Sequence, residues 1–208
     1  MKTLLFGTAW AENQEHMDGR CGRWYAHHQA IPWPCEVVFA LIGDGVSRDI
    51  RWPAGPVNIN LIPHLGRPGH LEHEGWWRSF SHAAHVAKQQ HCDRIWHVET
   101  DAYVASRRAV DWLYSVKSGW EVAWCPRYGF PETCIQAIGG DQFERLADYG
   151  RIYNKVKGQH PEHILPFSRV ERGLIGDRYG ETGDDPGRID GLDYYVQCPP
   201  HITVPYRQ

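Results

Sequence analysis

The segment Arg94-Ile-Trp-His-Val98, followed at once by Glu99-Thr-Asp101, is the stretch of sequence that decides the fold. Its first part is mainly apolar and includes β-branched residues, so it predicts a buried strand. Its last three residues place two carboxylates directly beyond that strand. In open α/β sheets, ligands bind beyond the carboxyl ends of the strands. The segment therefore also marks where a functional site is expected.

Strands and helices are expected to alternate on both sides of this segment. The expected strands are 4–6, 36–43, 57–62 and 121–125, and the expected helices are 18–30, 75–90 and 106–116, with a further short helix starting at 141. Such alternation predicts βαβ units around a mostly parallel sheet. We therefore expect one α/β domain over residues 1–208, with helices on both faces of a mostly parallel central sheet.

Composition and charge narrow the class of protein. A chain of 208 residues with 42% hydrophobic residues can bury one core, which excludes disordered and fibrous classes. The net charge of -3 gives no overall basic field toward nucleic acid or an anionic membrane. The longest apolar run, 37–42, is far shorter than the roughly 20 residues of a membrane-spanning helix.

The cysteines and the N-terminus bear on the compartment. The six cysteines are scattered, and none has C-x-x-C spacing, so we expect reduced thiols. The first ten residues lack the apolar region and small-residue cleavage site of a signal peptide, and we expect them to form the first strand. A cytoplasmic protein is the resulting prediction.

The two carboxylates Glu99 and Asp101 suggest metal chemistry. Residues two apart on an extended segment project to the same side, which suits shared binding of a hard divalent cation. A bound Mg²⁺ or Mn²⁺ neutralises the charge that develops when a diphosphate leaves. The sequence therefore predicts a cation site at the end of this strand.

The arrangement of the first half resembles a known family of enzymes. It contains a first strand with a base-binding turn, an apolar strand ending in Asp44, a helix carrying Arg78, and then Glu99-Thr100-Asp101. This order is similar to that of the GT-A-fold glycosyltransferases, whose Asp-x-Asp motif lies at the same point. The resemblance covers about the first 125 residues as an arrangement, and only the triplet is close in letters, with glutamate in the first place.

The resemblance implies a GT-A-like (Rossmann-like) domain, a nucleoside diphosphate sugar as donor substrate, and Mn²⁺ or Mg²⁺ as cofactor. It implies that Asp101 is the direct metal ligand and that Glu99 contacts ribose or a metal-bound water. A third ligand in this family is often a histidine near the C-terminus, for which His201 is the first candidate and His163 the second. The implied nucleotide-binding residues are Thr8, Ala9 and Trp10 along the base, Asp44 at the base or ribose, and Arg78 facing the nucleotide or its phosphates.

The sequence indicates the residues that would bind the acceptor less clearly than those that would bind the donor. An inverting transfer needs a carboxylate that takes the proton of the acceptor, and Glu132 and Asp185 are the candidates. A retaining enzyme needs no such base, and the sequence does not decide between the two. Residues 1–125 are expected to bind the nucleotide sugar and residues 126–208 the acceptor, which would enter over the glycine-rich segment 173–191. The acceptor could be a glycan, a small molecule, a protein or a modified DNA base.

Two alternatives to a glycosyltransferase stay open. A sugar nucleotidyltransferase uses a similar sheet and metal, although its usual glycine-rich signature is missing after the first strand. A non-catalytic carbohydrate- or nucleic-acid-binding module is compatible with the ten tryptophans, of which Trp33 and Trp52 are expected to be the exposed ones. Zinc and nicotinamide sites are rejected, because the histidines lack H-E-x-x-H spacing and 43–48 lacks the third glycine of a dinucleotide fingerprint.

Overall fold

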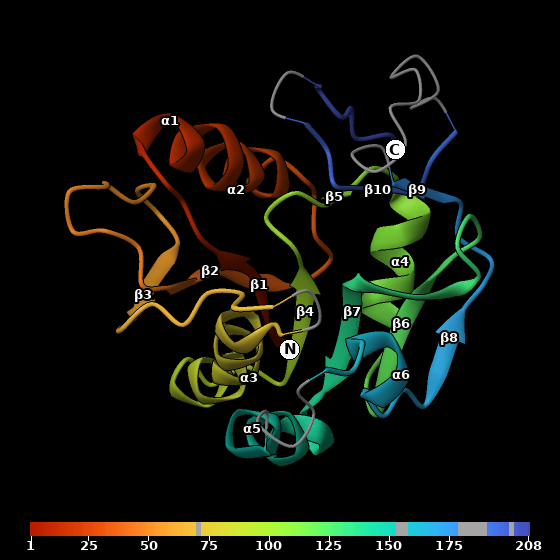
Figure 1. The fold of residues 1–208 in the computed structure, drawn as a ribbon. Helices are drawn as coiled ribbons and strands as arrows, with labels where there is room; N and C mark the ends of the chain where they lie inside the picture. Colours follow the sequence, from red (N-terminus) through yellow and green to blue (C-terminus); the bar gives the residue numbers. More distant parts are fainter. Residues whose placement is uncertain (70–71, 153–157, 179–190, 200–201) are drawn as a thin grey trace.

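The computed structural model describes residues 1–69, 72–152, 158–178, 191–199 and 202–208. These residues form a central seven-stranded sheet of order β3-β2-β1-β4-β7-β6-β8, with helices on both of its faces (Figure 1). Only β7 runs antiparallel to its two neighbours, so the prediction of a mostly parallel α/β sheet is confirmed. The strands are β1 (Lys2–Ala9), β2 (Glu36–Asp44), β3 (Val57–Leu61), β4 (Arg94–Val98), β6 (Trp120–Cys125), β7 (Phe130–Gly139) and β8 (Arg169–Glu171).

A small second sheet lies beyond the carboxyl end of β4. It has the order β5-β10-β9 and consists of β5 (Tyr103–Val104), β10 (Tyr194–Val196) and β9 (Gly176–Arg178). Strand β10 pairs antiparallel with β5 and parallel with β9. This sheet brings the C-terminal part of the chain next to the turn that follows β4.

The first helical segment begins earlier than predicted. It consists of α1 (Gln14–Met17), the π-helical turn η1 (Asp18–Gly22) and α2 (Arg23–Gln29), which follow one another without a break. Its start is set by Asn13, whose side-chain oxygen accepts a hydrogen bond from the His16 amide at 2.8 Å. This is an ordinary N-cap, and it extends the helix toward the N-terminus of the expected range 18–30.

The helices expected at 75–90, at 106–116 and from 141 agree closely with the structure, whereas α6 was not predicted. Helix α4 is capped by Ser106, whose hydroxyl accepts from the Ala109 amide at 3.2 Å. The bounds are α3 (Glu74–Gln89), α4 (Arg107–Ser115), η2 (Gly140–Gln142), α5 (Phe143–Ile152) and α6 (Pro161–Ile164). No helix among the described residues has both the length and the apolar character needed to cross a bilayer.

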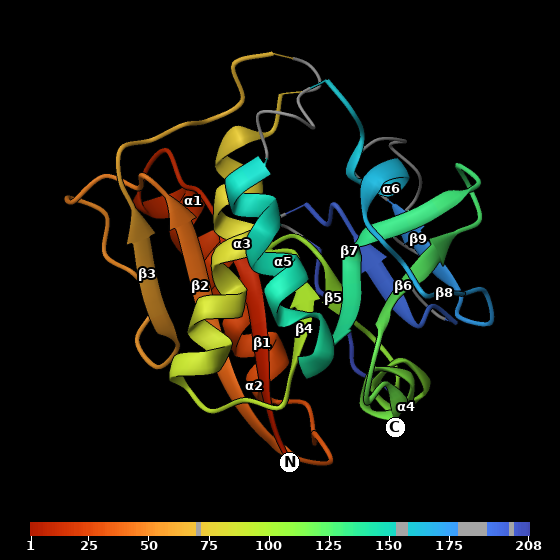
Figure 2. The same cartoon turned by 90° about the horizontal axis from the view of Figure 1, so that it is seen from below.

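Alternating side chains of the central strands build a core on each face of the sheet. On β1, Leu4 and Phe6 pack with α3 and α5, whereas Leu5 packs on the opposite face with α1, α2 and α4. Figure 2 shows α3 and α5 together on one side of the sheet. Successive residues of a strand point to opposite faces, so the continuously apolar strands follow from burial on both sides.

The tryptophan that is exposed differs from those expected to be exposed. Trp33 and Trp52, expected to be exposed, are half-buried and pack against the core on the α2 face. The exposed tryptophan is Trp10, with 42% of its surface accessible, at the end of β1. Burial of large aromatic rings dominates core energetics, which explains why residues beside prolines are nevertheless drawn inward.

The two predicted halves share one sheet. Strand β7, from the second half, lies between β4 and β6 of the first half. The chain after residue 125 is therefore built into the same core as the chain before it. All six cysteines are free thiols.

Stability is predicted to fall in mild acid because of His28. This side chain is fully buried, with Nδ1 2.8 Å from the Trp24 carbonyl and the Val104 amide donating to Nε2 at 3.4 Å. Burial lowers the pKa of His28 well below its usual value of 6.5. The unfolded chain therefore binds the proton more readily, and the stabilisation present above that value is lost as pH falls below it.

Urea unfolding between about pH 7.5 and about pH 5.5 should show this loss. In His28→Gln the slope of stability against pH should be shallower, and the protein should be destabilised by about 1–3 kcal/mol at the higher pH because two backbone groups lose their partner. The exposed His85→Gln variant is the control and should keep the parent slope. An unchanged slope in His28→Gln would refute the assignment.

Candidate functional site

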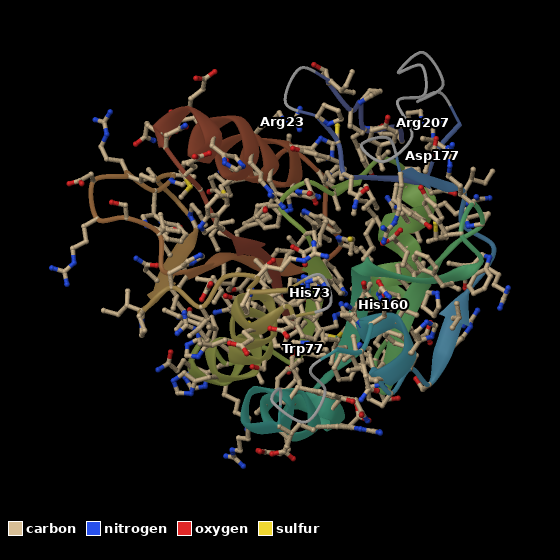
Figure 3. The ribbon with its side chains drawn as sticks, viewed as in Figure 1. Arg23, His73, Trp77, His160, Asp177 and Arg207 are labelled. Carbon is tan, nitrogen blue, oxygen red and sulfur yellow. The ribbon has the colours of Figure 1, made fainter. Side chains whose placement is uncertain are left out.

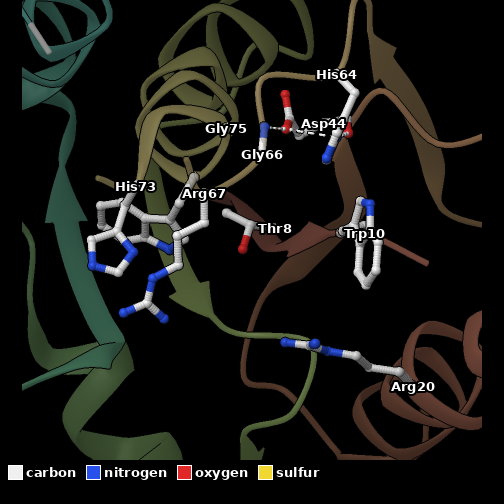
Figure 4. Close-up of a pocket in the computed structure, with 11 residues that line it drawn as sticks. Thr8, Trp10, Arg20, Asp44, His64, Gly66, Arg67, His73 and Gly75 are labelled. Atoms are coloured by element: carbon white, nitrogen blue, oxygen red, sulfur yellow. Dashed lines mark hydrogen bonds and ion pairs between the residues drawn. The ribbon is translucent and has the colours of Figure 1, made fainter. Parts of the chain in front are cut away.

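The carboxyl ends of β1, β2 and β4 meet at one edge of the sheet and border a cleft. The cleft consists of two adjoining hollows of about 470 Å³ and about 610 Å³. The residues that line both hollows are Thr8, Arg20, Arg67, His73 and Trp76. Figure 4 shows the first hollow, with Trp10 and Asp44 on one side and Arg67 and His73 on the other.

Glu99 is buried at the end of β4 and fastens three elements together. One carboxylate oxygen accepts from the Thr8 hydroxyl of β1, and the other accepts from the Trp76 indole N–H of α3. His97 Nε2 lies 3.2 Å from the latter oxygen. Burial by itself raises the pKa of Glu99, but the nearby His97 and the hydrogen bonds from His97, Thr8 and Trp76 outweigh it and lower that pKa. Glu99 is therefore ionised at neutral pH.

The segment after β4 is a turn, which corrects the expectation of an extended triplet. The Ala102 amide donates to the Glu99 carbonyl at 2.8 Å, so the chain reverses across the triplet. The two carboxylates are consequently different in their surroundings: Glu99 is enclosed, and the Asp101 side chain keeps 26% of its surface exposed in the second hollow. Glu99 also lines the second hollow, but of these two carboxylates Asp101 is the more exposed to it.

Asp101 is paired with Arg20 of the π-helical turn. Arg20 Nη2 donates to Asp101 Oδ2 at 3.0 Å, and Arg20 Nε donates to the Thr100 hydroxyl at 2.9 Å. Thr100 in turn donates to the Thr8 carbonyl at 2.8 Å. Burial raises the pKa of Asp101, Arg20 lowers it and the charge of Glu99 raises it, leaving it above its usual value. Asp101 thus lies between a guanidinium with which it pairs and a second carboxylate whose charge repels its own.

Asp44 lines the first hollow but is bound by its own neighbours, and Arg78 lies away from the cleft. Asp44 accepts from the Gly66 amide at 2.7 Å and from Arg78, and its Oδ2 lies 3.0 Å from His64 Nδ1. Arg78 also donates to the carbonyls of Leu61 and Pro63, and it lines neither hollow. Asp44 therefore fixes the loop that forms one wall of the first hollow, and Arg78 holds that loop from behind.

Thr8, Ala9 and Trp10 all line the first hollow, where a base was expected. The exposed ring of Trp10 lies against His64, with 6.1 Å between ring centroids and 28° between planes. A flat, accessible aromatic surface of this kind can carry a nucleobase or a sugar ring.

The second half of the chain supplies the far wall of the second hollow. Figure 3 shows His73, just before α3, and His160, just before α6, near one another at the middle of the molecule. Glu162 also lines this wall and accepts from the Thr133 hydroxyl at 2.8 Å. The other lining residues from this half are Tyr128, Phe130, Cys134, Pro161, His163, Arg178 and Gln197.

Glu132 is placed where it cannot readily act as a base. It is fully buried, lines neither hollow, and binds Arg178 with both oxygens, one of them at 2.7 Å from Nη2. A general base needs hydrogen-bond reach to the acceptor's proton, so the geometry argues against this candidate. The other candidate, Asp185, lies outside the described residues, as do His201 and most of the glycine-rich segment 173–191.

The donor set for a cation is incomplete within the described part of the chain. No group of three or more His, Cys, Asp or Glu residues suited to a metal is found there. Asp101 lies beside Cys198, whose amide donates to the Asp101 carbonyl at 2.9 Å. Asp101 offers the kind of hard oxygen that Mg²⁺ or Mn²⁺ prefers.

Sequence reasoning missed several residues of the cleft. Arg20, Arg67, His73, Trp76 and Glu162 line it, but none of them stands in a motif. Trp76 also belongs in part to the core, because its ring stacks on Phe80. The remaining polar residues occupy loops and helix surfaces whose orientation depends on tertiary contacts.

The fold is that of GT-A glycosyltransferases, and comparison with solved structures identifies similar proteins. One is a glycosyltransferase involved in glycosylation of the major capsid of PBCV-1, with a TM-score of 0.51, 10% identity, and coverage of 95% of this chain and 92% of that one. Another is the galactosyltransferase LgtC in complex with donor and acceptor sugar analogues, with a TM-score of 0.53, 12% identity, and coverage of 96% and 88%.

An active-site mutant of LgtC is similar to the same degree, with a TM-score of 0.54, 12% identity, and coverage of 95% and 87%. Neither protein-family models nor curated protein sequences give a match to this chain. At such low identity the likeness establishes the fold, and the chemistry has to be argued from the cleft.

Arg23 is predicted to hold the C-terminal segment beside the cleft. It donates to the carbonyls of Pro199 at 2.8 Å, Ile202 at 2.6 Å and Cys198 at 3.1 Å, and to the Tyr103 hydroxyl at 2.8 Å. In Arg23→Met these carbonyls lose a charged donor, and we expect a loss of about 2–3 kcal/mol in stability.

Hydrogen exchange should locate that effect, with faster exchange at the amides flanking this segment, including Cys198 and Ile202. Tyr103→Phe, which removes a single partner of Arg23, is the matched control and should cost about 1 kcal/mol. Unchanged exchange at those amides in Arg23→Met would contradict the assigned role.

Proposed function

We propose that this protein is a metal-dependent glycosyltransferase that moves a sugar from a nucleoside diphosphate donor to an acceptor. The observation that carries the proposal is the position of Asp101 at the carboxyl end of β4, open to a cleft that begins at the exposed ring of Trp10. The likeness to LgtC, a galactosyltransferase crystallised with donor and acceptor sugar analogues, supports the same assignment.

We assign a task to each side of the cleft. The nucleoside would occupy the first hollow, with its base on Trp10 and against the loop that Asp44 fixes. Asp101 would hold the cation, with His201 as a further ligand. When bound, that Mn²⁺ or Mg²⁺ ion would neutralise the charge of the departing diphosphate. Glu99 would be a positioning residue, because its buried contacts fix the turn that orients Asp101 toward the cleft.

The sugar and the acceptor would occupy the second hollow. Its far wall comes from the second half of the chain, in keeping with an acceptor-binding role for that half. Aromatic side chains there, Tyr128 and Phe130, are stacked with ring centroids 5.6 Å apart and suit contact with a sugar ring. Asp185 is retained as a candidate base, and a cytoplasmic location stays a prediction.

Donor binding should depend on both the metal and Asp101. With Mn²⁺ present, the correct nucleotide sugar at about 100 times its Kd should stabilise the protein by about 2.7 kcal/mol, which raises Tm by about 5–10 °C. A panel of UDP-, GDP-, ADP- and TDP-sugars, each with Mn²⁺ and with chelator, would identify it by thermal shift.

Asp101→Asn should lose most of that Tm shift and lower transfer and donor hydrolysis by about 100-fold or more, with the fold unchanged. Asp111→Asn, an exposed carboxylate on α4 that lines neither hollow, is the control and should behave as the parent. Full metal-dependent turnover in Asp101→Asn would refute the proposal, and so would binding to glycan or DNA alone.

A further inference from the structure

Arg20 lies where the two hollows of the cleft meet. Among the described arginines, only Arg67 also lines both hollows. Arg20 lines in addition a third hollow of about 190 Å³ on the far side of Asp101. It comes from the π-helical turn η1, and π-helical turns occur frequently at functional sites. In Figure 4 its side chain extends from the helical segment toward Thr8, into the cleft.

The guanidinium of Arg20 has unused donors. A guanidinium carries five N–H groups, and the hydrogen bonds to Asp101 and Thr100 use two of them. Within the described part of the chain, Arg20 Nη1 has no hydrogen-bond partner. The side chain keeps 30% of its surface exposed, so a ligand in the cleft can reach it.

Arg20 keeps its positive charge in the cleft, where nearby carboxylates favour it. Burial lowers the pKa of Arg20, and the charges of Asp101 and Glu99 raise it above its usual value. An arginine matches phosphate oxygens with two parallel N–H bonds, which is the geometry that favours diphosphate recognition. A nucleoside in the first hollow and a sugar in the second would place the linking diphosphate at the junction where Arg20 lies.

We propose that Arg20 binds the diphosphate of the donor, and that it exchanges Asp101 for phosphate oxygens when the donor enters. This inference rests on the proposed function and adds to it a residue and an exchange of partners. In the free protein Arg20 neutralises Asp101. In the complex the same charge moves to the diphosphate, and the Asp101 carboxylate is released to the cation. No bond is made or broken covalently in this step.

Calorimetry with matched ligand pairs tests the binding role. UDP, GDP, ADP and TDP are compared with their nucleosides on the parent protein, and the pair that binds best is measured on the variants. In Arg20→Ala the diphosphate should bind about tenfold or more weakly while the nucleoside is unaffected, because only charge-assisted hydrogen bonds are lost. Arg20→Lys should recover part of the affinity, and Arg145→Ala, an exposed arginine on α5, should match the parent.

A mutant cycle tests the exchange of partners. With chelator present, Asp101→Asn should tighten diphosphate binding because Arg20 no longer has a competing carboxylate. This gain in diphosphate affinity should be larger when Arg20 is present than in Arg20→Ala. A merely structural arginine would not produce such a coupling between the two residues. Circular dichroism and Tm confirm that each variant is folded.

The outcomes separate the two proposals. If the parent binds none of the four diphosphates, the proposed function fails, and this inference fails with it. If the parent binds one of them and Arg20→Ala keeps the same ratio of diphosphate to nucleoside affinity, only the role of Arg20 is overturned. Equal gains from Asp101→Asn in the two backgrounds would overturn the exchange.

Discussion

The buried carboxylate of Glu99 is the contact on which the site depends. It joins the ends of β1 and β4 to α3 through Thr8, His97 and Trp76. An ionised carboxylate in a low-dielectric interior is costly unless it is hydrogen-bonded, and Thr8 and Trp76 each donate to one of the Glu99 oxygens. Because Glu99 is fixed inward, the turn that follows β4 is fixed as well, and Asp101 faces the cleft.

This arrangement divides labour between the two acidic residues. Glu99 contributes rigidity, and Asp101 contributes an oxygen with access to ligands. A binding or catalytic site needs both, because the residues that contact a ligand are positioned only as accurately as the residues that support them. Asp44 has a similar part at the end of β2, where its carboxylate holds the loop at 64–66 and also lines the first hollow. Buried acids thus shape the cleft, and Trp10, Arg20 and Asp101 are the more exposed residues in it.

The sequence sufficed for a mostly parallel α/β sheet with helices on both faces, but it did not predict β7, which lies between β4 and β6. Leu4, Leu5 and Phe6 predict a strand buried on both faces, and Ser106 predicts a helix start. The sequence did not predict how individual side chains are oriented. Glu99 turns inward because of Thr8 and Trp76, which are distant in sequence, and Arg20 meets Asp101 across 81 residues. Such contacts are set by tertiary packing, which local patterns do not encode.

The most direct test of the account is a crystal grown with Mn²⁺ and the nucleoside diphosphate that binds best, measured for the anomalous signal of manganese. We expect a manganese peak at the Asp101 carboxylate, the base against Trp10, and Glu99 still enclosed by its three partners. A manganese peak and nucleotide elsewhere, with the turn after β4 devoid of both, would contradict it.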